Sequence, residues 1–130
     1  MARSRSLILF GMLGLAGCAD AQATPADPNN DVHCSVVAFY FRGHPATQAA
    51  PADQRHALEM VHQWYSAKAR DAAAQQGEAA VRGQAGPVLE AVKSDFLGHR
   101  DALAACTNRA VADPSFDSWL RTRGGRAQRG

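Results

Sequence analysis

The sequence predicts an all-α fold, a small three-to-four-helix bundle stapled by one disulfide. Three observations support this prediction: 27 of the 130 residues are alanine, apolar residues recur at helical spacing, and runs of strand-forming residues are almost absent. Alanine buries little apolar area, and a chain of this length has a small core. We therefore expect a covalent staple to supply much of the stability of the bundle.

The first helix is predicted from Asp31, which can cap it, through about Phe41. Residues 34–41 are also rich in β-branched and aromatic side chains, which is typical of a buried strand. No second strand candidate is present to pair with this segment, so a helix is favoured. Two apolar stripes follow helical spacing: Val32, Val36, Phe39 and Tyr40, and Cys34, Val37, Ala38 and Phe41.

Three further helices are expected within residues 31–120, the predicted helical domain. The second spans residues 52–76 and stops at Gly77. Pro87 suits the first turn of the third, which Gly98 bends or splits. Asp113-Pro114 opens a short fourth helix. The third helix carries the clearest apolar stripe: Val88, Val92, Phe96, His99, Leu103 and Cys106.

Residues 1–17 have the organisation of a signal peptide, with two arginines before an apolar run that is too short to span a bilayer. The segment Leu15-Ala16-Gly17-Cys18 resembles the lipobox of bacterial lipoproteins. The resemblance implies cleavage before Cys18, acylation of that residue and, with Ala19 following it, location on the periplasmic side of the outer membrane. Residues 18–30 are then the lipidated cysteine and a flexible tether. The alternative is a periplasmic or secreted protein without the lipid, cleaved after Ala21 or Ala23.

Two cysteines, Cys34 and Cys106, remain once Cys18 is assigned to the lipid. An even count in an oxidising compartment predicts a disulfide. The loop that it closes is long, and the chain-entropy model gives such a loop a stabilisation of roughly 4 kcal/mol. The alternative is a pair of buried free thiols.

The charge is divided between two regions. Residues 19–120 hold eight basic and twelve acidic side chains, whereas residues 121–130 hold Arg121, Arg123, Arg126 and Arg129 and no acid. The tail has no large apolar residue, so we expect it to be a disordered basic tail. Its charge either neutralises the acidic domain or contacts an anionic surface, lipid or cell wall, close to the membrane.

No pattern in the chain indicates catalysis or a cofactor. The five histidines include no pair at the spacing that places two metal ligands on one helix face: His33, His44, His56, His62 and His99. Carboxylates are scattered, and phosphate-binding glycine loops and nucleophile motifs are missing. The sequence therefore predicts a non-enzyme with no metal, no cofactor and no nucleic-acid partner.

The placement of Cys34 on an early apolar helix, a central segment Trp64-Tyr65-Ser-Ala-Lys-Ala-Arg70 and Ala104-Ala-Cys106 resembles small exported bacterial proteins without an assigned function. The Ala105-Cys106-Thr107 context is similar to that in the HdeA family of periplasmic acid-stress chaperones. Both resemblances imply a helical domain in which Cys34 and Cys106 form a disulfide, with no catalytic residue. Two functions follow: a binding or envelope-organising protein whose partner is an envelope protein or the cell wall, or an acid-activated chaperone.

Overall fold

All regular secondary structure is helical in the part of the chain that the computed structural model describes, residues 22–129, and no strand occurs there. This confirms the predicted fold class. Among these residues, no helix combines the length and the apolar character needed to cross a bilayer. The elements are α1 (Asp31–Gly43), α2 (Pro45–Gln48), α3 (Ala52–Gln76), α4 (Glu78–Ser94), the 3-10 turn η1 (Leu97–His99), α5 (Arg100–Ala112) and α6 (Pro114–Arg129).

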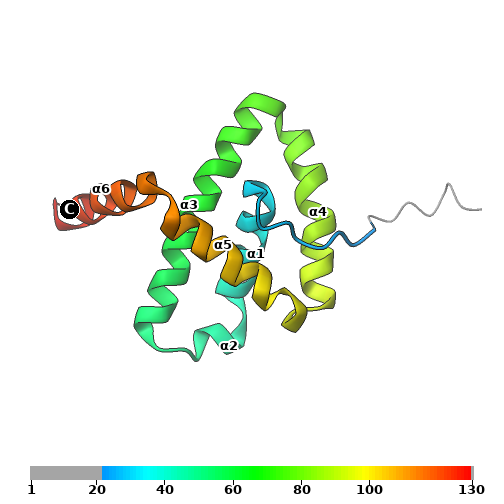
Figure 1. Cartoon of the computed structure of the whole chain (residues 1–130), viewed down its shortest axis with the longest axis horizontal. Coiled ribbons are helices and arrows are strands. Elements are labelled where there is room, and N and C mark those ends of the chain that lie inside the picture. The colour runs from blue at the N-terminus through cyan, green and yellow to red at the C-terminus, as the bar shows by residue number, and fades with distance from the viewer. Residues whose placement is uncertain (1–21, 130) are drawn as a thin grey trace, which may run out of the picture.

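The two longest elements that pack together, α3 and α4, form the arms of an inverted V (Figure 1). Helix α1 lies behind and packs against both arms, and α5 crosses in front of α1. Helix α6 extends away from this body, and its first turns contact α5. The core therefore surrounds α1, which every larger helix except α6 contacts.

The N-cap of α1 lies one residue earlier than the sequence predicts. The side chain of Asn30, and not that of Asp31, accepts hydrogen bonds from the backbone N–H groups of Val32 and His33, at 2.9 and 3.1 Å. The carboxylate of Asp31 instead pairs with Arg109 on α5. One predicted stripe is buried and the other is partly exposed, so the helix interpretation of this segment is confirmed; its buried residues are Val32, Cys34, Val37, Ala38 and Phe41.

Helix α3 has the bounds that the sequence predicts, Ala52–Gln76. Gly77 ends it with φ +96° and ψ 147°, a conformation that is open essentially to glycine alone. This residue turns the chain back into α4, and it sets the angle between the two arms of the V.

The predicted third helix differs from the structure in its start and in its continuity. Helix α4 starts at Glu78, directly after Gly77, because the alanine, glutamate, arginine and glutamine residues of 78–86 favour a helix strongly enough to offset Gly83 and Gly86, and Pro87 lies inside it. The chain breaks at Asp95, with φ −142°, and the Asp95 carboxylate accepts a hydrogen bond from Gly98 N at 3.0 Å. The prediction that the stripe is split near Gly98 is therefore confirmed, and its second half forms α5.

Helix α6 begins at Pro114, as predicted, and continues to Arg129. The structure thus differs from the predicted disordered tail, residues 121–130, over 121–129. The Arg121 guanidinium pairs with the Asp117 carboxylate one turn earlier, at 2.6 Å, and Arg123 lies over the Trp119 ring at 4.9 Å. Such contacts within one helix favour its continuation past Leu120.

Residues 22–30, here named the N-terminal strap, differ from the predicted flexible tether because they are attached to the helices. Thr24 N–H donates to the Pro87 carbonyl of α4 at 3.0 Å, and Ala26 packs against Val37, Phe41, Val88 and Val92. The Pro28 carbonyl accepts from Arg109 Nε at 2.8 Å. A free tether is therefore limited to residues before Thr24. Cys18 and the predicted signal peptide, residues 1–17, lie outside the described residues.

Candidate binding groove

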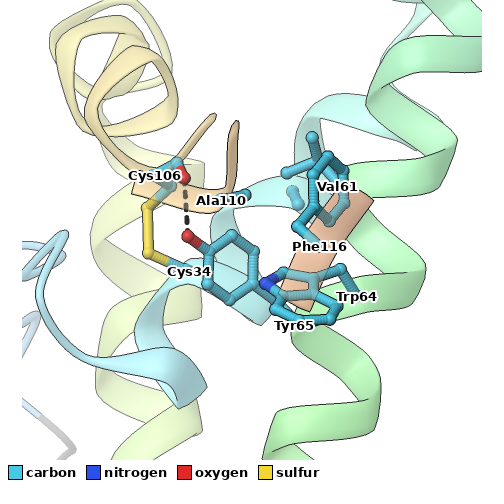
Figure 2. Close-up of a cluster of buried hydrophobic side chains, with 8 residues drawn as sticks. Cys34, Val61, Trp64, Tyr65, Cys106, Ala110 and Phe116 are labelled. Atoms are coloured by element: carbon cyan, nitrogen blue, oxygen red, sulfur yellow. Dashed lines mark hydrogen bonds between the residues drawn. A yellow bond between two sulfur atoms is a disulfide. The ribbon is translucent and has the colours of Figure 1, made fainter. Parts of the chain in front are cut away.

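The disulfide joins the two helices that cross at the centre of the molecule. Cys34 of α1 and Cys106 of α5 are fully buried, with their Cα atoms 5.7 Å apart, and the structure confirms the predicted pairing. Figure 2 shows the side chains of α3 and α6 that pack beside it. We name this set the disulfide cluster: Cys34, Ala38, Val61, Trp64, Tyr65, Cys106, Ala110 and Phe116.

Polar anchors reinforce the disulfide cluster. The Tyr65 hydroxyl donates to the Cys106 carbonyl at 2.5 Å, shown as the dashed line in Figure 2. Burial raises the pKa of Tyr65, because an ionised phenol would lose its solvation there, so the hydroxyl keeps the proton that it donates. The aromatic rings of Trp64 and Phe116 meet edge to face, at 5.2 Å between centroids, and seal the side that faces α6.

Arg109 connects three separate segments around this cluster. Its guanidinium donates to the Pro28 carbonyl of the N-terminal strap, pairs with the Asp31 carboxylate of α1 at 2.8 Å, and lies over the Tyr65 ring at 5.1 Å. Sequence reasoning missed this residue, because a basic side chain in the last turn of a helix is a common and unspecific feature.

An open groove of about 740 Å³ lies between α2, the first half of α3, η1 and α5. Most of its lining is apolar, including Phe41, Leu58, Phe96 and Leu103. Leu97 at its edge is 69% exposed, the largest exposed fraction among the large apolar side chains of the described residues. Its volume falls within the roughly 300–1,000 Å³ of small-molecule sites. The sequence predicted the apolar stripe that forms one wall, and it did not predict the groove.

The charge in the groove comes from one side chain. Arg100 is the only charged residue that lines it, and the other polar groups are Thr47, Gln54, Thr107 and Asn108. Arg100 makes no ion pair with any residue from 22 to 123. The groove is therefore an apolar channel with one cationic position, at the end where α5 begins.

Three histidines accept backbone N–H groups through a ring nitrogen. His33 Nδ1 accepts from Asp27 at 3.0 Å, and His99 Nε2 accepts from Ala26 at 3.5 Å, so both hold the N-terminal strap. His44 Nδ1 accepts from Ala46 at 3.2 Å and caps α2, which forms a wall of the groove. A nitrogen that accepts in this way must be unprotonated, so these contacts require neutral imidazoles.

Burial lowers the pKa of His33, and the Asp27 carboxylate partly opposes that shift. Burial likewise lowers the pKa of His62 on α3, and the Arg42 guanidinium adds to this, against the raising effect of Glu59. Burial opposes ionisation of Glu59, but its hydrogen bonds from Gln63 and Arg42 and the Arg42 charge outweigh that cost and keep the pKa of this carboxyl below its ordinary value. The domain thus favours neutral His33 and His62.

The remaining predicted site residues lie apart from the groove. Arg121 and Arg123 are exposed on α6, and Arg126 and Arg129 lie in its last turns. Within residues 22–129, no three side chains of the His, Cys, Asp and Glu types gather closely enough to hold a metal ion.

No protein-family model, curated protein or solved structure matches this chain. Function can therefore be inferred only from the residues and geometry of the chain itself.

Proposed function

We propose that this chain is an exported, membrane-anchored helical protein of the bacterial envelope, and that its domain binds an apolar ligand in the open groove. The groove is the observation that carries this proposal, because an apolar channel of small-molecule size is left unfilled beside a tightly packed core. The disulfide supports the exported location, since disulfides persist in oxidising compartments. A binding role also agrees with the absence of a catalytic motif.

The anchor in this proposal is Cys18 in Leu15-Ala16-Gly17-Cys18. Six peptide steps separate Cys18 from Thr24, the first strap residue with a backbone hydrogen bond to a helix, and they span at most about 20 Å when extended. A lipid on Cys18 would therefore hold the domain close to the membrane surface. Such proximity suits a protein that receives its ligand from the membrane or from an envelope partner.

The anchor is tested by replacing Cys18. Cys18→Ala should release the protein from membrane fractions, and intact-mass analysis of the wild-type protein should show acyl chains on Cys18. Arg3 and Arg5 stay unchanged in both proteins, so that export begins in the same way. A mature N-terminus at Gln22 or Thr24 would contradict the anchor and support ordinary secretion.

The groove is tested with residues 19–130, which hold every described element, and the neutral fluorescent probe N-phenylnaphthylamine. Ala104 is exposed and lines the groove, so Ala104→Trp should fill it and abolish most of the rise in probe fluorescence. Ala80 is exposed on α4 and does not line the groove, so Ala80→Trp is the matched control and should bind like the wild type. Equal binding by all three proteins would remove the groove from the proposal.

The basic end of α6 is proposed as a second attachment to an anionic surface, lipid or cell wall. Arg121 and Arg123 are exposed there, although the first pairs with Asp117 and the second lies over Trp119. Each arginine near an anionic surface adds on the order of 1 kcal/mol, which salt weakens. Deleting residues 121–130 should reduce binding of residues 19–130 to anionic vesicles or cell-wall sacculi at low salt. If the deletion does not change retention on vesicles or sacculi, the tail serves only to neutralise the charge of the acidic domain.

A second candidate function, an acid-activated chaperone, is favoured by the three histidines that accept backbone N–H groups. Protonation of His33, whose pKa is lowered by burial, would place an N–H against the Asp27 N–H, which would loosen the N-terminal strap and expose the apolar residues beneath it. Suppression of the aggregation of a reporter enzyme should then rise as the pH falls below about 6.5.

The two functions are separated by a variant of His33 that keeps the hydrogen-bond acceptor and does not titrate. Asparagine Oδ1 occupies the position of histidine Nδ1, so His33→Asn should hold Asp27 N at every pH. This variant should lose chaperone activity in acid and keep probe binding in the groove at neutral pH. Equal chaperone activity of the wild type and the variant in acid would contradict the acid-activated function.

A further inference from the structure

Each of the two long walls of the groove covers about two helical turns. On α3 the lining residues extend from Gln54 to Val61, and on α5 they extend from Arg100 to Asn108. At 1.5 Å per residue, the α5 wall is about 12 Å long. An apolar wall of this length can accommodate one extended hydrocarbon chain.

The two ends of the α5 wall differ in chemistry. Arg100 stands at one end, and the uncharged Thr107 and Asn108 stand at the other. No carboxylate lines the groove, so an anionic group beside Arg100 would meet no like charge from the lining. Leu97, the first residue of η1, lies at the same end, and its exposed side chain would be covered by a bound chain.

We propose that the groove binds a single-chain anionic amphiphile, with its hydrocarbon chain along Leu58, Leu103 and Ala104 and its acidic head group at Arg100. This inference rests on the proposed function and names its ligand class. Each methylene that leaves water contributes about 0.8 kcal/mol, so affinity should increase with chain length until the groove is filled. A guanidinium binds carboxylate or phosphate oxygens through two parallel N–H donors, and a fatty acid or an anionic lysophospholipid supplies such oxygens.

The experiment measures displacement of N-phenylnaphthylamine from residues 19–130 by laurate and by dodecanol, each below its micelle concentration. The two ligands share a chain and differ in the head group. Laurate should displace the probe at about tenfold lower concentration than dodecanol, and octanoate should be weaker than laurate. A second set of displacement measurements uses lysophosphatidylglycerol and lysophosphatidylcholine. Its comparison with laurate distinguishes a phospholipid from a free fatty acid as the source of the ligand.

Two arginine variants locate the head group. Arg100→Gln should reduce the advantage of laurate over dodecanol, both measured on the same variant, by about fivefold to tenfold, because the charged contact is lost. Arg82→Gln is the control, because Arg82 is an exposed arginine of α4 that pairs with Glu78 and does not line the groove. Thermal unfolding of each variant, monitored by circular dichroism, confirms that both are folded.

Three results would overturn the inference, and they separate it from the proposed function. If the probe binds in the groove and laurate is no better than dodecanol, or Arg100→Gln changes nothing, the groove binds an apolar ligand of another class. If residues 19–130 form a dimer that Ala104→Trp dissociates, the groove is a self-association surface and the amphiphile is excluded. If neither the probe nor laurate binds, the binding function itself fails.

Discussion

Helices α3 and α5 pack tightly at one place and separate at another. At the disulfide cluster they are joined by the Tyr65–Cys106 hydrogen bond and by Arg109 over the Tyr65 ring, and a disulfide bonds α5 to α1. Toward the first half of α3 they separate, and an open groove lined by Leu58 and Leu103 remains. One pair of helices is therefore closed at one place and open at the other.

The comparison shows where this small domain places its stability. Val61 belongs to the disulfide cluster and also lines the groove, so the wall of the groove is supported from behind by the best-packed part of the core. Because a disulfide constrains the position of α5 without filling space in the groove, the helices need not close over it. A domain of this size can thus keep an apolar channel open and remain folded.

The largest effect is expected from breaking the closed region. Cys106→Ala removes a disulfide between residues 72 apart in the sequence, which the chain-entropy model values at roughly 4 kcal/mol. We expect a large fall in the thermal midpoint and loss of laurate binding, because α5 would no longer be fixed as a wall of the groove. Reduced wild-type protein is the control and should unfold at the same temperature as the variant. A variant as stable as oxidised wild type would show that the disulfide does not hold the domain together.

A smaller effect is expected at the turn between α3 and α4. Gly77→Ala forces a side chain into φ +96° and should lower the free energy of unfolding by about 1–3 kcal/mol, as measured by urea denaturation. Gly83 is helical in α4, with open space around an added Cβ, so Gly83→Ala should be neutral or stabilise by up to about 1 kcal/mol. The same effect at both glycines would contradict the conformational role of Gly77.

The hydroxyl of Tyr65 tests whether the two regions are independent. Tyr65→Phe leaves the ring in place and deprives the Cys106 carbonyl of its donor, which should cost about 1–2 kcal/mol. The affinity for laurate at neutral pH, measured by probe displacement, should stay within about twofold, since Tyr65 does not line the groove. A loss of binding in proportion to the loss of stability would show that the groove depends on the whole core.

The smallest effect is expected from His33 and should be confined to acid. The pKa of His33 is lowered in the folded state, so below about pH 6.5 the unfolded chain binds more protons than the folded protein. The free energy of unfolding therefore decreases as the pH decreases. His33→Asn should therefore unfold like the wild type at pH 8 and at a higher temperature than the wild type at pH 5, by differential scanning calorimetry. Equal pH dependence in both proteins would remove His33 from the acid response.

The elements that the sequence predicts well are those set by local signals. Gly77 fixes the end of α3, Asp113-Pro114 fixes the start of α6, and the two cysteines that follow Cys18 form the predicted disulfide. Local signals failed where a partner far along the chain decides the outcome. The N-terminal strap is held by Pro87, His99 and Arg109, which lie 63 to 81 residues away from the strap residues that they contact.

The groove could be predicted only in part. The stripe that includes Phe96 and Leu103 gives the signal of a buried helix face, because apolar residues at helical spacing are usually buried against another helix. Whether a second helix covers such a stripe depends on the angle between α3 and α5, which a disulfide and a short α2 determine together. Arg100 gave no signal in sequence, because an exposed arginine acquires a role only through the residues that lie around it.

Hydrogen exchange with and without laurate, followed by mass spectrometry of the oxidised protein, tests the contrast between the closed and open regions most directly. We predict slower exchange in peptides that cover α2, the first half of α3 and residues 96–108, and unchanged exchange in α4 and α6. Arg100→Gln should reduce this protection at equal laurate concentration, and Arg82→Gln should not. Protection confined to α4 or α6, or no protection at the groove under saturating laurate, would contradict a binding site beside a closed core.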